Sequence, residues 1–476
     1  MLKLISPVQL AVSNSQLSAI IYFIDVGNHM VDIKDVLEKE FELNDLPADE
    51  MKIRKILEAN DGARIRTWLS ICSRCGLCAE SCFVYVSNDR NPKLSPAYKF
   101  KHTLGEMYRR KGRLSRKFLE KCYEIAWLQC TMCKRCSMFC PFGIDIATMI
   151  SIARNVCHSQ GFKPESLAKF SENCRTSGNH MGIPEDELID TCEWMAEEAE
   201  DDYQGVQIPI DKPNANYMYT INPREPVYYP QDISYAAIIL TAARESWTIP
   251  SFGWDCTNLP MFCGDRNLAG QQVKNVYEKA RELGAEKILI TECGHAYRSM
   301  AFEGPYLAGY ENGKPPVEVV HFVRLLYEYL RDGRIKIDPN KKIKAPVTYQ
   351  DPCNVSRNGG LWEEGRKIMS YIADDFRDMS PNREHNHCCG GGGGIMPMGP
   401  KYRPVRMASG RLKAEQIKAT GAEIVIAPCH NCFDQINDLS EEYDLGVKVL
   451  SFKEIIIETM IVPDHMRLED DDLEIH

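Results

Sequence analysis

The hydrophobic and polar positions of the chain follow two different periods. Up to about residue 205 apolar residues recur at helical spacing, as in Ile53, Ile56 and Leu57, and strand signals are weak. After Pro230 short apolar runs alternate with helical stretches, which is typical of an α/β domain with a largely parallel sheet. The pattern predicts strands at 236–240, 288–290, 347–349 and 424–426 and helices at 274–283, 322–330 and 411–417. The fold class that we expect is α plus α/β.

The segments around this helical part are less regular. Residues 1–29 are interpreted as a loose extension, followed by a helical stripe that begins with Ile33, Val36 and Leu37. Residues 161–205 are predicted to be helical and to end in the acidic run 197–202, a solvated helix end. A linker or extended segment is predicted next, where prolines and tyrosines are interleaved: Pro213, Pro223, Pro226 and Pro230 with Tyr217, Tyr219, Tyr228 and Tyr229.

The α/β part contains an internal repeat. Residues 284–293 resemble 421–429, and Val317-x-Val319-x-x-Phe322 resembles Val447-x-Val449-x-x-Phe452. Phe262-Cys263-Gly264 falls where Cys388-Cys389-Gly390 falls, so the matched segments occur in the same order. A duplicated unit of this kind predicts two copies packed about a pseudo-twofold axis, with a site at their junction.

Composition and charge exclude several classes of protein. The 476 residues carry a net charge of −10 and are 44% apolar and 26% charged, which is ordinary for a globular protein. The negative charge argues against nucleic acid as a partner. No run approaches the roughly 20 apolar residues of a spanning helix, and no secretory signal is recognised. We therefore expect a cytoplasmic protein that reaches a membrane through partner subunits.

The chain contains 20 cysteines, and they affect the interpretation of the sequence most. Two runs of them have the spacing of ferredoxin ligands. The runs are Cys72-x-x-Cys75-x-x-Cys78-x-x-x-Cys82 and Cys130-x-x-Cys133-x-x-Cys136-x-x-x-Cys140-Pro141. In two-cluster ferredoxins the fourth cysteine of each run binds the other cluster. We therefore expect one cubane [4Fe–4S] cluster on Cys72, Cys75, Cys78 and Cys140, and a second on Cys130, Cys133, Cys136 and Cys82. A redox-inert zinc scaffold, which would use paired CxxC motifs, is the weaker alternative.

A third group of cysteines lies at the ends of predicted strands: Cys353, Cys388, Cys389, Cys429 and Cys432. Five converging thiolates suit a metal cluster with more ligands than a cube, and a reducing compartment disfavours disulfides. The glycine run 390–394 lacks the patterns of nucleotide loops, so we expect no nucleotide or flavin on this chain. These glycines would instead let the backbone approach a cluster closely.

The first repeat is degenerate at this motif. Phe262 stands where the first cysteine of the pair would be, and Ala296 stands where the second cysteine of CxxC would be. Two thiolates, Cys263 and Cys293, cannot hold a full cluster, so we expect no cluster in this half. The cysteines outside the three groups are interpreted as small buried hydrophobic residues: Cys122, Cys157, Cys174, Cys192, Cys256, Cys263 and Cys293.

The pattern Cys353…Cys388-Cys389-Gly390…Cys429-x-x-Cys432 resembles the CCG domain of heterodisulfide reductases. Over roughly residues 60 to 460 the chain resembles the catalytic iron–sulfur subunit of membrane-bound heterodisulfide reductase. It is also similar to the K subunit of the sulfate-reducer Dsr membrane complex, although the gap from Gly390 to Cys429 is longer than is usual in the family. The resemblance implies that the five CCG cysteines hold a noncubane [4Fe–4S] cluster where a disulfide is reduced or formed.

The resemblance also implies a division of the chain and a set of partners. The expected parts are an N-terminal helical extension (1–59), a helical ferredoxin domain (60–160), a helical segment and linker (161–230), a degenerate CCG repeat (231–335), a CCG repeat with a cluster (336–465) and an acidic tail (466–476). The expected partners are a membrane cytochrome b-type subunit, other redox subunits, and a disulfide on a small molecule or a small carrier protein. The expected setting is an anaerobic, membrane-associated complex.

The candidate catalytic residues are Cys388 and Cys389. His295, His387 and His430 are candidate proton donors because histidine titrates near neutrality, and His295 is favoured because the degenerate repeat would face the cluster across the pseudo-twofold axis. The alternative function is an electron-transfer subunit of a flavin dehydrogenase complex, of the glycolate or glycerol-3-phosphate type, that delivers electrons to quinone.

Overall fold

The computed structural model describes residues 23–24, 31–32 and 48–468. Its contacts divide the chain into two units, 1–43 and 44–476. In the first unit strands β1 (Phe23–Ile24) and β2 (Val31–Asp32) pair in antiparallel fashion. The predicted helical stripe from Ile33 lies outside the described residues, as do most of the segments interpreted as a loose extension (1–29) and an acidic tail (466–476).

The second unit begins with a mainly helical part, as predicted. Its α-helices are α2 (Glu50–Ala59), α3 (Ala63–Ile71), α4 (Leu77–Glu80), α5 (Phe83–Ser87), α6 (Pro96–Phe100), α7 (Glu106–Arg109), α8 (Arg116–Tyr123), α9 (Arg135–Met138), α10 (Ile146–Ser159), α11 (Glu165–Ser177) and α12 (Glu185–Asp202). Helix α2 begins where the Asp49 side chain accepts the backbone N–H of Lys52, and it buries Ile53 and Leu57 from the predicted stripe. Short π-helical turns, η2 (Lys101–Gly105) and η3 (Glu124–Leu128), continue α6 and α8.

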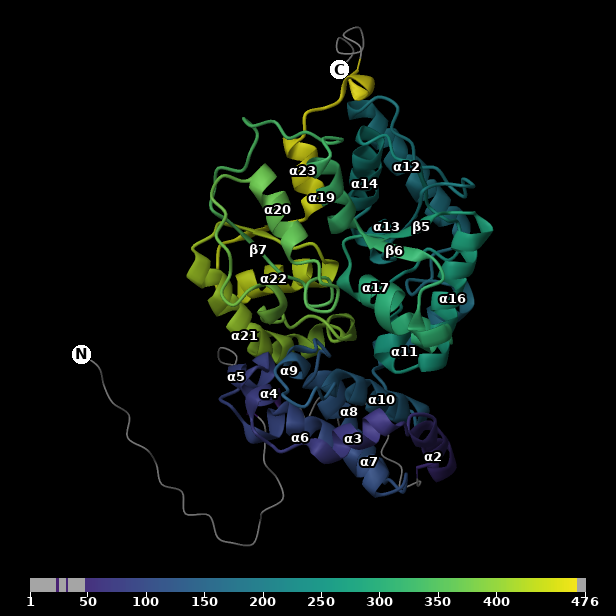
Figure 1. Cartoon of the computed structure of the whole chain (residues 1–476), viewed down its shortest axis with the longest axis vertical. Helices are drawn as coiled ribbons and strands as arrows, with labels where there is room; N and C mark the ends of the chain where they lie inside the picture. Colours follow the sequence, from purple (N-terminus) through teal and green to yellow (C-terminus); the bar gives the residue numbers. More distant parts are fainter. Residues whose placement is uncertain (1–22, 25–30, 33–47, 469–476) are drawn as a thin grey trace, which may run out of the picture. The chain divides into compact units, whose positions relative to one another are not determined.

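A parallel sheet of four strands follows, in the order β4-β3-β5-β6. Figure 1 labels two of these strands, β5 and β6. The strands are β3 (Tyr217–Thr220), β4 (Trp247–Thr248), β5 (Lys287–Ile290) and β6 (Glu318–His321), and each neighbouring pair is parallel. The helices of this region are α13 (Arg224–Tyr228), α14 (Gln231–Ala242), α15 (Leu259–Cys263), α16 (Arg266–Glu282), α17 (Gly294–Tyr297), α18 (Gly304–Leu307) and α19 (Phe322–Arg331), with the π-helical turn η4 (Arg298–Glu303).

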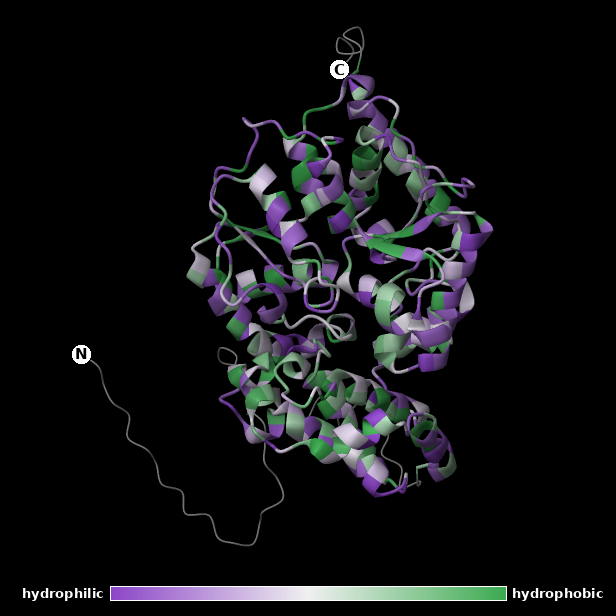
Figure 2. Cartoon of the chain, viewed as in Figure 1, coloured by the Kyte–Doolittle hydropathy of each residue, from purple (hydrophilic) through white to green (hydrophobic). Residues whose placement is uncertain are grey.

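One prediction in this region was wrong. Residues 236–240 belong to helix α14 and form no strand. Residues 236–240 are all apolar and buried, and periodicity cannot separate such a run in a helix from a buried strand. Residues 217–220, predicted as a linker or extended segment, form the strand β3 between β4 and β5, with all four side chains buried. Figure 2 shows the hydrophobic residues along α14 and the neighbouring strands.

A second parallel sheet has the order β7-β8-β9. Its strands are β7 (Val347–Tyr349), β8 (Ile424–Ile426) and β9 (Lys448–Leu450), and its helices are α20 (Glu363–Ile372), α21 (Arg403–Thr420), α22 (His430–Glu442) and α23 (Phe452–Thr459). The predicted strands at 288–290, 347–349 and 424–426 are confirmed, as are the predicted helices. The strands β6 and β9, which the sequence prediction missed, lie in the two matched Val-x-Val-x-x-Phe segments.

The two halves share an order of elements. In each, a long helix (α16 or α21) precedes the central strand (β5 or β8), and the last strand (β6 or β9) leads directly into a helix (α19 or α23). One hydrophobic core spans both sheets, because Leu289 of β5, Ile426 of β8 and Phe452 of α23 belong to the same buried cluster. The observed helices and parallel sheets are compatible with the predicted fold class, α plus α/β. The pseudo-twofold axis and the domain boundaries remain our proposals.

Candidate iron–sulfur sites

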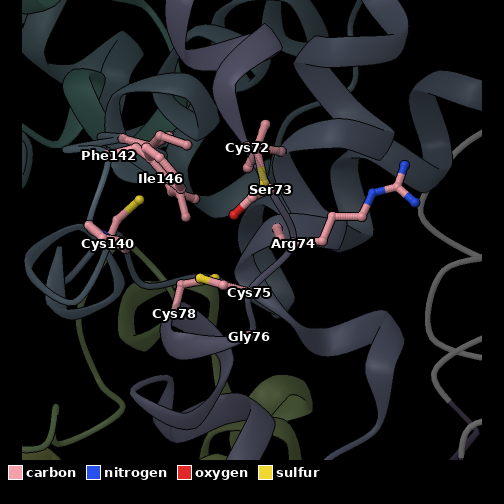
Figure 3. A pocket seen from close by; sticks show the side chains of 13 residues that line it. Cys72, Ser73, Arg74, Cys75, Gly76, Cys78, Cys140, Phe142 and Ile146 are labelled. Atoms are coloured by element: carbon pink, nitrogen blue, oxygen red, sulfur yellow. The ribbon is translucent and has the colours of Figure 1, made fainter.

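The first predicted ligand set surrounds one cavity (Figure 3). Cys72 ends α3, Cys75 lies on the following loop, Cys78 lies in α4, and Cys140 follows α9. The four cysteines come from both ferredoxin runs, and they are the set expected from interleaved ligation. The structure therefore brings together the four residues that the sequence assigned to one cubane cluster.

The walls of this cavity are apolar, and one side faces solvent. Phe142 lines it with 42% of its surface exposed, and Cys75 is exposed. The Arg74 side chain points away from the thiols (Figure 3). Burial raises the pKa of Cys78 to about 11, with a smaller contribution from the neighbouring cysteine thiolates. Metal binding must therefore displace a proton from this thiol.

The second predicted set, Cys82, Cys130, Cys133 and Cys136, also converges. Burial raises the pKa of Cys136 well above its usual value, and the charges of Cys133, Cys82 and Cys130 raise it further because these thiols are its neighbours. Lys99 is buried, and its Nζ lies 3.9 Å from Cys82 Sγ. An ammonium group at this position favours thiolate ligands.

The two ferredoxin loops have the same backbone conformation. In the first, Arg74 and Gly76 have φ values of 59° and 86°, and in the second, Met132 and Lys134 have φ values of 54° and 64°. The left-handed residues occupy the second and fourth positions after the first cysteine of each run, and each loop leads into a four-residue helix. Alternation of this kind turns backbone N–H groups toward one centre, which suits an anionic cluster.

The third set of cysteines lies at the carboxyl ends of the second sheet. Cys353 follows β7, and Cys429 and Cys432 lie at the start of α22, directly after β8. Cys432 Sγ lies 3.4 Å from Cys389 Sγ, and the hydrogen-bonded neighbours of Cys388 include Cys353 and Cys389. The five thiols are therefore contiguous, as a shared cluster requires.

Backbone N–H groups point at this third set. Gly390 N–H donates to Cys388 Sγ at 3.4 Å, and Gly294 N–H donates to Cys429 Sγ at 3.4 Å. The second of these bonds comes from the degenerate half, so both halves contact the CCG thiols. Hydrogen bonds to sulfur are one of the means by which proteins tune iron–sulfur clusters.

The second and third sets meet. Cys133 and Cys388 are hydrogen-bonded neighbours, and Thr131 Oγ1 lies 3.5 Å from Cys388 Sγ. A Cβ atom on Gly393 would lie 2.6 Å from the backbone of Thr131, so a larger residue would not fit there. The glycine run thus allows the CCG loop to approach the second ferredoxin loop.

Three buried or half-buried arginines hold this junction. Arg154 donates to the carbonyl of Cys130 at 3.0 Å, Arg298 to that of Met132 at 2.8 Å, and Arg357 to that of Cys133 at 2.9 Å. The residues that receive these bonds lie in one four-residue stretch of the second loop. Sequence reasoning missed these arginines, because their contacts come from distant parts of the chain.

His295, the favoured candidate for the proton donor, lies beside the glycine run. Its Nε2 accepts the backbone N–H of Gly393 at 3.2 Å, and the Asn431 side-chain amide lies 2.8 Å from Nδ1. Burial lowers the pKa of His295 to about 3, and the charge of Arg298 lowers it further. Both nitrogens of the imidazole therefore have neighbours, and Nε2 contacts the glycine run. The role of His295 as proton donor stays a prediction.

The other two histidines differ from each other. Burial lowers the pKa of His387 to about 3, with Arg135 as a further cause. Burial also lowers the pKa of His430, but its bonds to Asp232 and Cys293 outweigh this, and the net pKa lies well above the usual value. His430 Nε2 lies 2.8 Å from Asp232 Oδ2.

A group of buried charges beside Cys429 escaped the sequence analysis. Lys453 Nζ lies 3.4 Å from Asp232 Oδ2 and 3.9 Å from Glu225 Oε2. Glu292 is buried nearby, where its carboxylate accepts the backbone N–H groups of Phe452 and Lys453. Burial raises the pKa of Glu292 to about 7. The motif Glu292-Cys293-Gly294-His295 was a weak indication of this group in the sequence. No sequence pattern indicated that Asp232 belongs to it.

In the degenerate half the cysteines separate. Cys293 lies near Cys256 and within 3.8 Å of the Asn222 amide, whereas Cys263 is hydrogen-bonded to Ser171. Phe262 and Ala296 are buried at the positions where the intact repeat has cysteines. All the cysteines outside the three sets are buried, in agreement with their interpretation as small core residues.

Comparisons with known proteins agree with these sites. The family model of a 4Fe-4S dicluster domain matches residues 68–144, and that of a cysteine-rich domain (CCG) matches residues 347–437. Together, the fold, the cysteine sites and these two family models give the class of the protein. The chain is an iron–sulfur oxidoreductase protein with 4Fe–4S clusters.

The relatives then narrow the class. The chain is 26% identical over 460 residues to the Hdr-like menaquinol oxidoreductase iron-sulfur subunit of Archaeoglobus profundus, with 83% of this chain and 80% of the relative covered. It is 24% identical over 404 residues to the D subunit of the dihydromethanophenazine:CoB–CoM heterodisulfide reductase of Methanosarcina barkeri, with 82% and 94% covered. It is 22% identical over 439 residues to the EtfAB:quinone oxidoreductase of Syntrophomonas wolfei, with 82% and 58% covered. The protein is thus an iron–sulfur subunit like the D subunit of heterodisulfide reductase. Among the helices of residues 48–468, none is long and apolar enough to cross a membrane.

Proposed function

We propose that the chain passes electrons through two cubane [4Fe–4S] clusters to a noncubane [4Fe–4S] cluster on the CCG cysteines, where a disulfide is reduced or formed. The observation that carries this proposal is the contact between Cys133 of the second ferredoxin loop and Cys388 of the CCG set. Adjacent ligand residues leave little protein between the last cubane and the CCG cluster. The ligand sets are those named above, and Cys388 and Cys389 carry the chemistry.

The thiols and N–H groups on these loops fit the clusters that we assign to them. When bound, the clusters supply single electrons, and a disulfide needs two. Around them, Lys99 stabilises thiolate charge at Cys82, and Gly390 and Gly294 donate N–H groups to the CCG sulfurs. His295 holds the glycine run in place through Gly393.

The setting of the reaction follows from the relatives, which are subunits of redox complexes. In our proposal the chain lies on the cytoplasmic side of a membrane and is held there by partners, among them a cytochrome b-type subunit that supplies or accepts electrons. The disulfide belongs to a small cofactor or to a small carrier protein.

The test separates the CCG site from the cubanes. Anaerobically purified protein should contain about 12 irons per chain, for three clusters of four. Cys388→Ser and Cys389→Ser should lower this to about eight, because serine oxygen is a poorer ligand for iron than thiolate. Disulfide reduction with a reduced dye as donor should collapse, while dithionite still reduces the cubanes. Cys192→Ser, at a buried position of α12, is the matched control.

Reduction at a near wild-type rate with the third cluster gone would overturn CCG-site chemistry. Stoichiometric zinc with little iron would overturn all three cluster assignments.

A second candidate function is supported by the names of two relatives, which refer to menaquinol and to quinone. In it the chain is a pure electron-transfer subunit, of a flavin dehydrogenase complex for instance, and has no disulfide substrate. Wild-type protein that reduces no disulfide but passes electrons to a soluble quinone would favour this candidate.

A further inference from the structure

A cavity of about 210 Å³ reaches the CCG site at Cys429. Its lining comes from four places that the fold brings together: the start of α14, the end of β5, the start of α22 and the start of α23. Cys429 and Ala427 line it beside the carboxyl end of β8. The cavity therefore gives a substrate a route to a cysteine of the proposed noncubane cluster.

Aromatic side chains form part of its wall. Tyr229 contacts Phe433 edge to face, with ring centroids 6.2 Å apart, and it stacks on His430 at 6.0 Å. The Tyr229 hydroxyl donates to Asp434 at 2.7 Å, which fixes the ring. Tyr235 also lines the cavity. The Arg224 guanidinium already lies over the Tyr229 ring, 5.6 Å from its centroid, so these side chains offer a ligand mainly apolar contact area.

The charged groups of the lining are mostly acidic. Asp232, Glu292 and Glu454 all line it. Among the residues that the structure describes, no lysine or arginine belongs to the lining, and its one basic side chain, His430, is bonded to Asp232. Sites for sulfonate, phosphate or carboxylate groups depend on arginine or lysine, and an anion in this cavity would meet carboxylates.

Two carboxylates at the cavity, those of Glu225 and Asp232, are already paired with a cation, the ammonium group of Lys453. Ligand atoms of Glu225, Asp232 and His430 lie within 4.8 Å of one another, an arrangement that could hold a metal ion. The buried Lys453 ammonium, however, lies between the two carboxylates and neutralises them. Glu292 is buried and already accepts two backbone N–H groups. The acidic group that remains for an incoming molecule is Glu454, which is partly exposed in the first turn of α23.

We propose that this cavity binds a disulfide whose flanking group is positively charged, such as a cysteinyl disulfide beside a basic side chain, and that it disfavours disulfides flanked by anionic groups. The inference rests on the proposed function, because it takes Cys429 to be part of the reacting site. The reaction is R–S–S–R + 2 e⁻ + 2 H⁺ → 2 RSH. The S–S bond breaks, the electrons come from the donor through the cubanes, the protons come from solvent, and two S–H bonds form.

Three probes with the same disulfide and different ends test the charge rule on the holoprotein. They are cystamine with two ammonium groups, bis(2-hydroxyethyl) disulfide with neutral ends, and bis(2-sulfoethyl) disulfide with two sulfonates. With a reduced dye as donor, kcat/KM should fall in that order, by about tenfold from the first probe to the last. Binding gives a second readout: cysteamine should alter the EPR spectrum of the oxidised protein at about tenfold lower concentration than 2-mercaptoethanesulfonate.

Glu454→Gln should shrink the ratio between cystamine and the sulfonate probe about threefold, and Glu454→Lys should shrink it further or reverse it. Glu458→Gln, one turn along α23 at an exposed position outside the cavity lining, is the matched control and should leave the ratio unchanged. Iron content and cubane reduction report whether each variant is intact.

A sulfonate probe that matches or exceeds cystamine in both kcat/KM and EPR titration would overturn the inference and leave the proposed function standing. The same holds if Glu454→Gln and Glu458→Gln have equal effects. If the wild type reduces none of the three probes and no thiol alters its EPR spectrum, the proposed disulfide function fails with it.

Discussion

The two ferredoxin-type loops have the same backbone conformation but lie in different surroundings. Both loops carry left-handed residues at the same two positions and lead into a four-residue helix. At the first site, however, Cys75 is exposed and the side chain of Leu77 is 51% exposed. At the second site hydrogen bonding to Cys388 and burial raise the pKa of Cys133 well above its usual value, and burial does the same for Cys136.

Charge separates the two sites even more clearly. The second loop is surrounded by the cations Lys99, Arg154, Arg298 and Arg357, and carries Arg135 itself, which donates to the carbonyls of Ser81 and His385. Arg74 of the first loop points away from its thiols (Figure 3). Because reduction adds negative charge to a cluster, nearby cations raise its reduction potential. We therefore expect a cluster on the second loop to have the higher reduction potential of the two.

The largest expected difference is in the loss of iron. A water-soluble Fe²⁺ chelator should remove iron from the first site about tenfold faster than from the second, because Cys75 of the first set is exposed, whereas each cysteine of the second set is only partly exposed. EPR of the dithionite-reduced protein, sampled during chelation, would follow each cubane. Equal rates of iron loss from the two sites would contradict the expected difference in solvent exposure. The same holds if the EPR signal of the cubane that couples to the CCG cluster is lost first.

The junction of the second site with the CCG loop should be sensitive to one Cβ atom. Gly393→Ala places that atom 2.6 Å from the Thr131 backbone at a φ of +69°. Gly399→Ala is the matched control, because its φ is +99° and nothing lies within 4 Å of its Cβ. Both substitutions carry backbone strain, and overpacking should cost Gly393→Ala about 1–3 kcal/mol more in the free energy of unfolding.

Denaturant unfolding would measure that free energy, and dye-driven reduction of the third cluster should slow for Gly393→Ala alone. Equal effects of the two alanines would show that backbone strain, and not the close approach, explains the glycine.

A smaller effect is expected on the reduction potential of the second cubane. Lys99→Met keeps the buried stem and removes the ammonium group near Cys82. It should lower that potential by about 60 mV, which corresponds to about 1.4 kcal/mol for one electron. Arg74→Met, at the exposed position of the first loop, should leave both potentials nearly unchanged. An EPR-monitored redox titration would show the shift, and a shift of the first cubane by Lys99→Met would contradict the assignment.

The sequence predicted these sites unevenly, for physical reasons. Ligand spacing is a local property, so the first set from Cys72 to Cys140 could be named in advance. The strands at 288–290, 347–349 and 424–426 were predictable as short apolar runs. The strand predicted at 236–240 was wrong because these five consecutive residues of α14 are all apolar and buried, and such a run has no helical periodicity. The cations and carboxylates around the sites, such as Lys99 and Asp232, were not predictable, because tertiary contacts bring them there.

The smallest expected effect concerns the comparison between the two α/β halves. Cys263→Ser and Cys293→Ser should leave iron content and EPR spectra unchanged, because Phe262 and Ala296 have already replaced the other ligands of this half. The structure strengthens the argument, since Cys263 lies with Ser171 while Cys293 lies with Cys256 and Asn222. Cys293→Ser could still reduce turnover, because His430 beside Cys429 is bonded to Cys293. Iron analysis of each variant against Cys192→Ser measures the effect. A selective loss of about four irons would show that the degenerate half binds a cluster of its own.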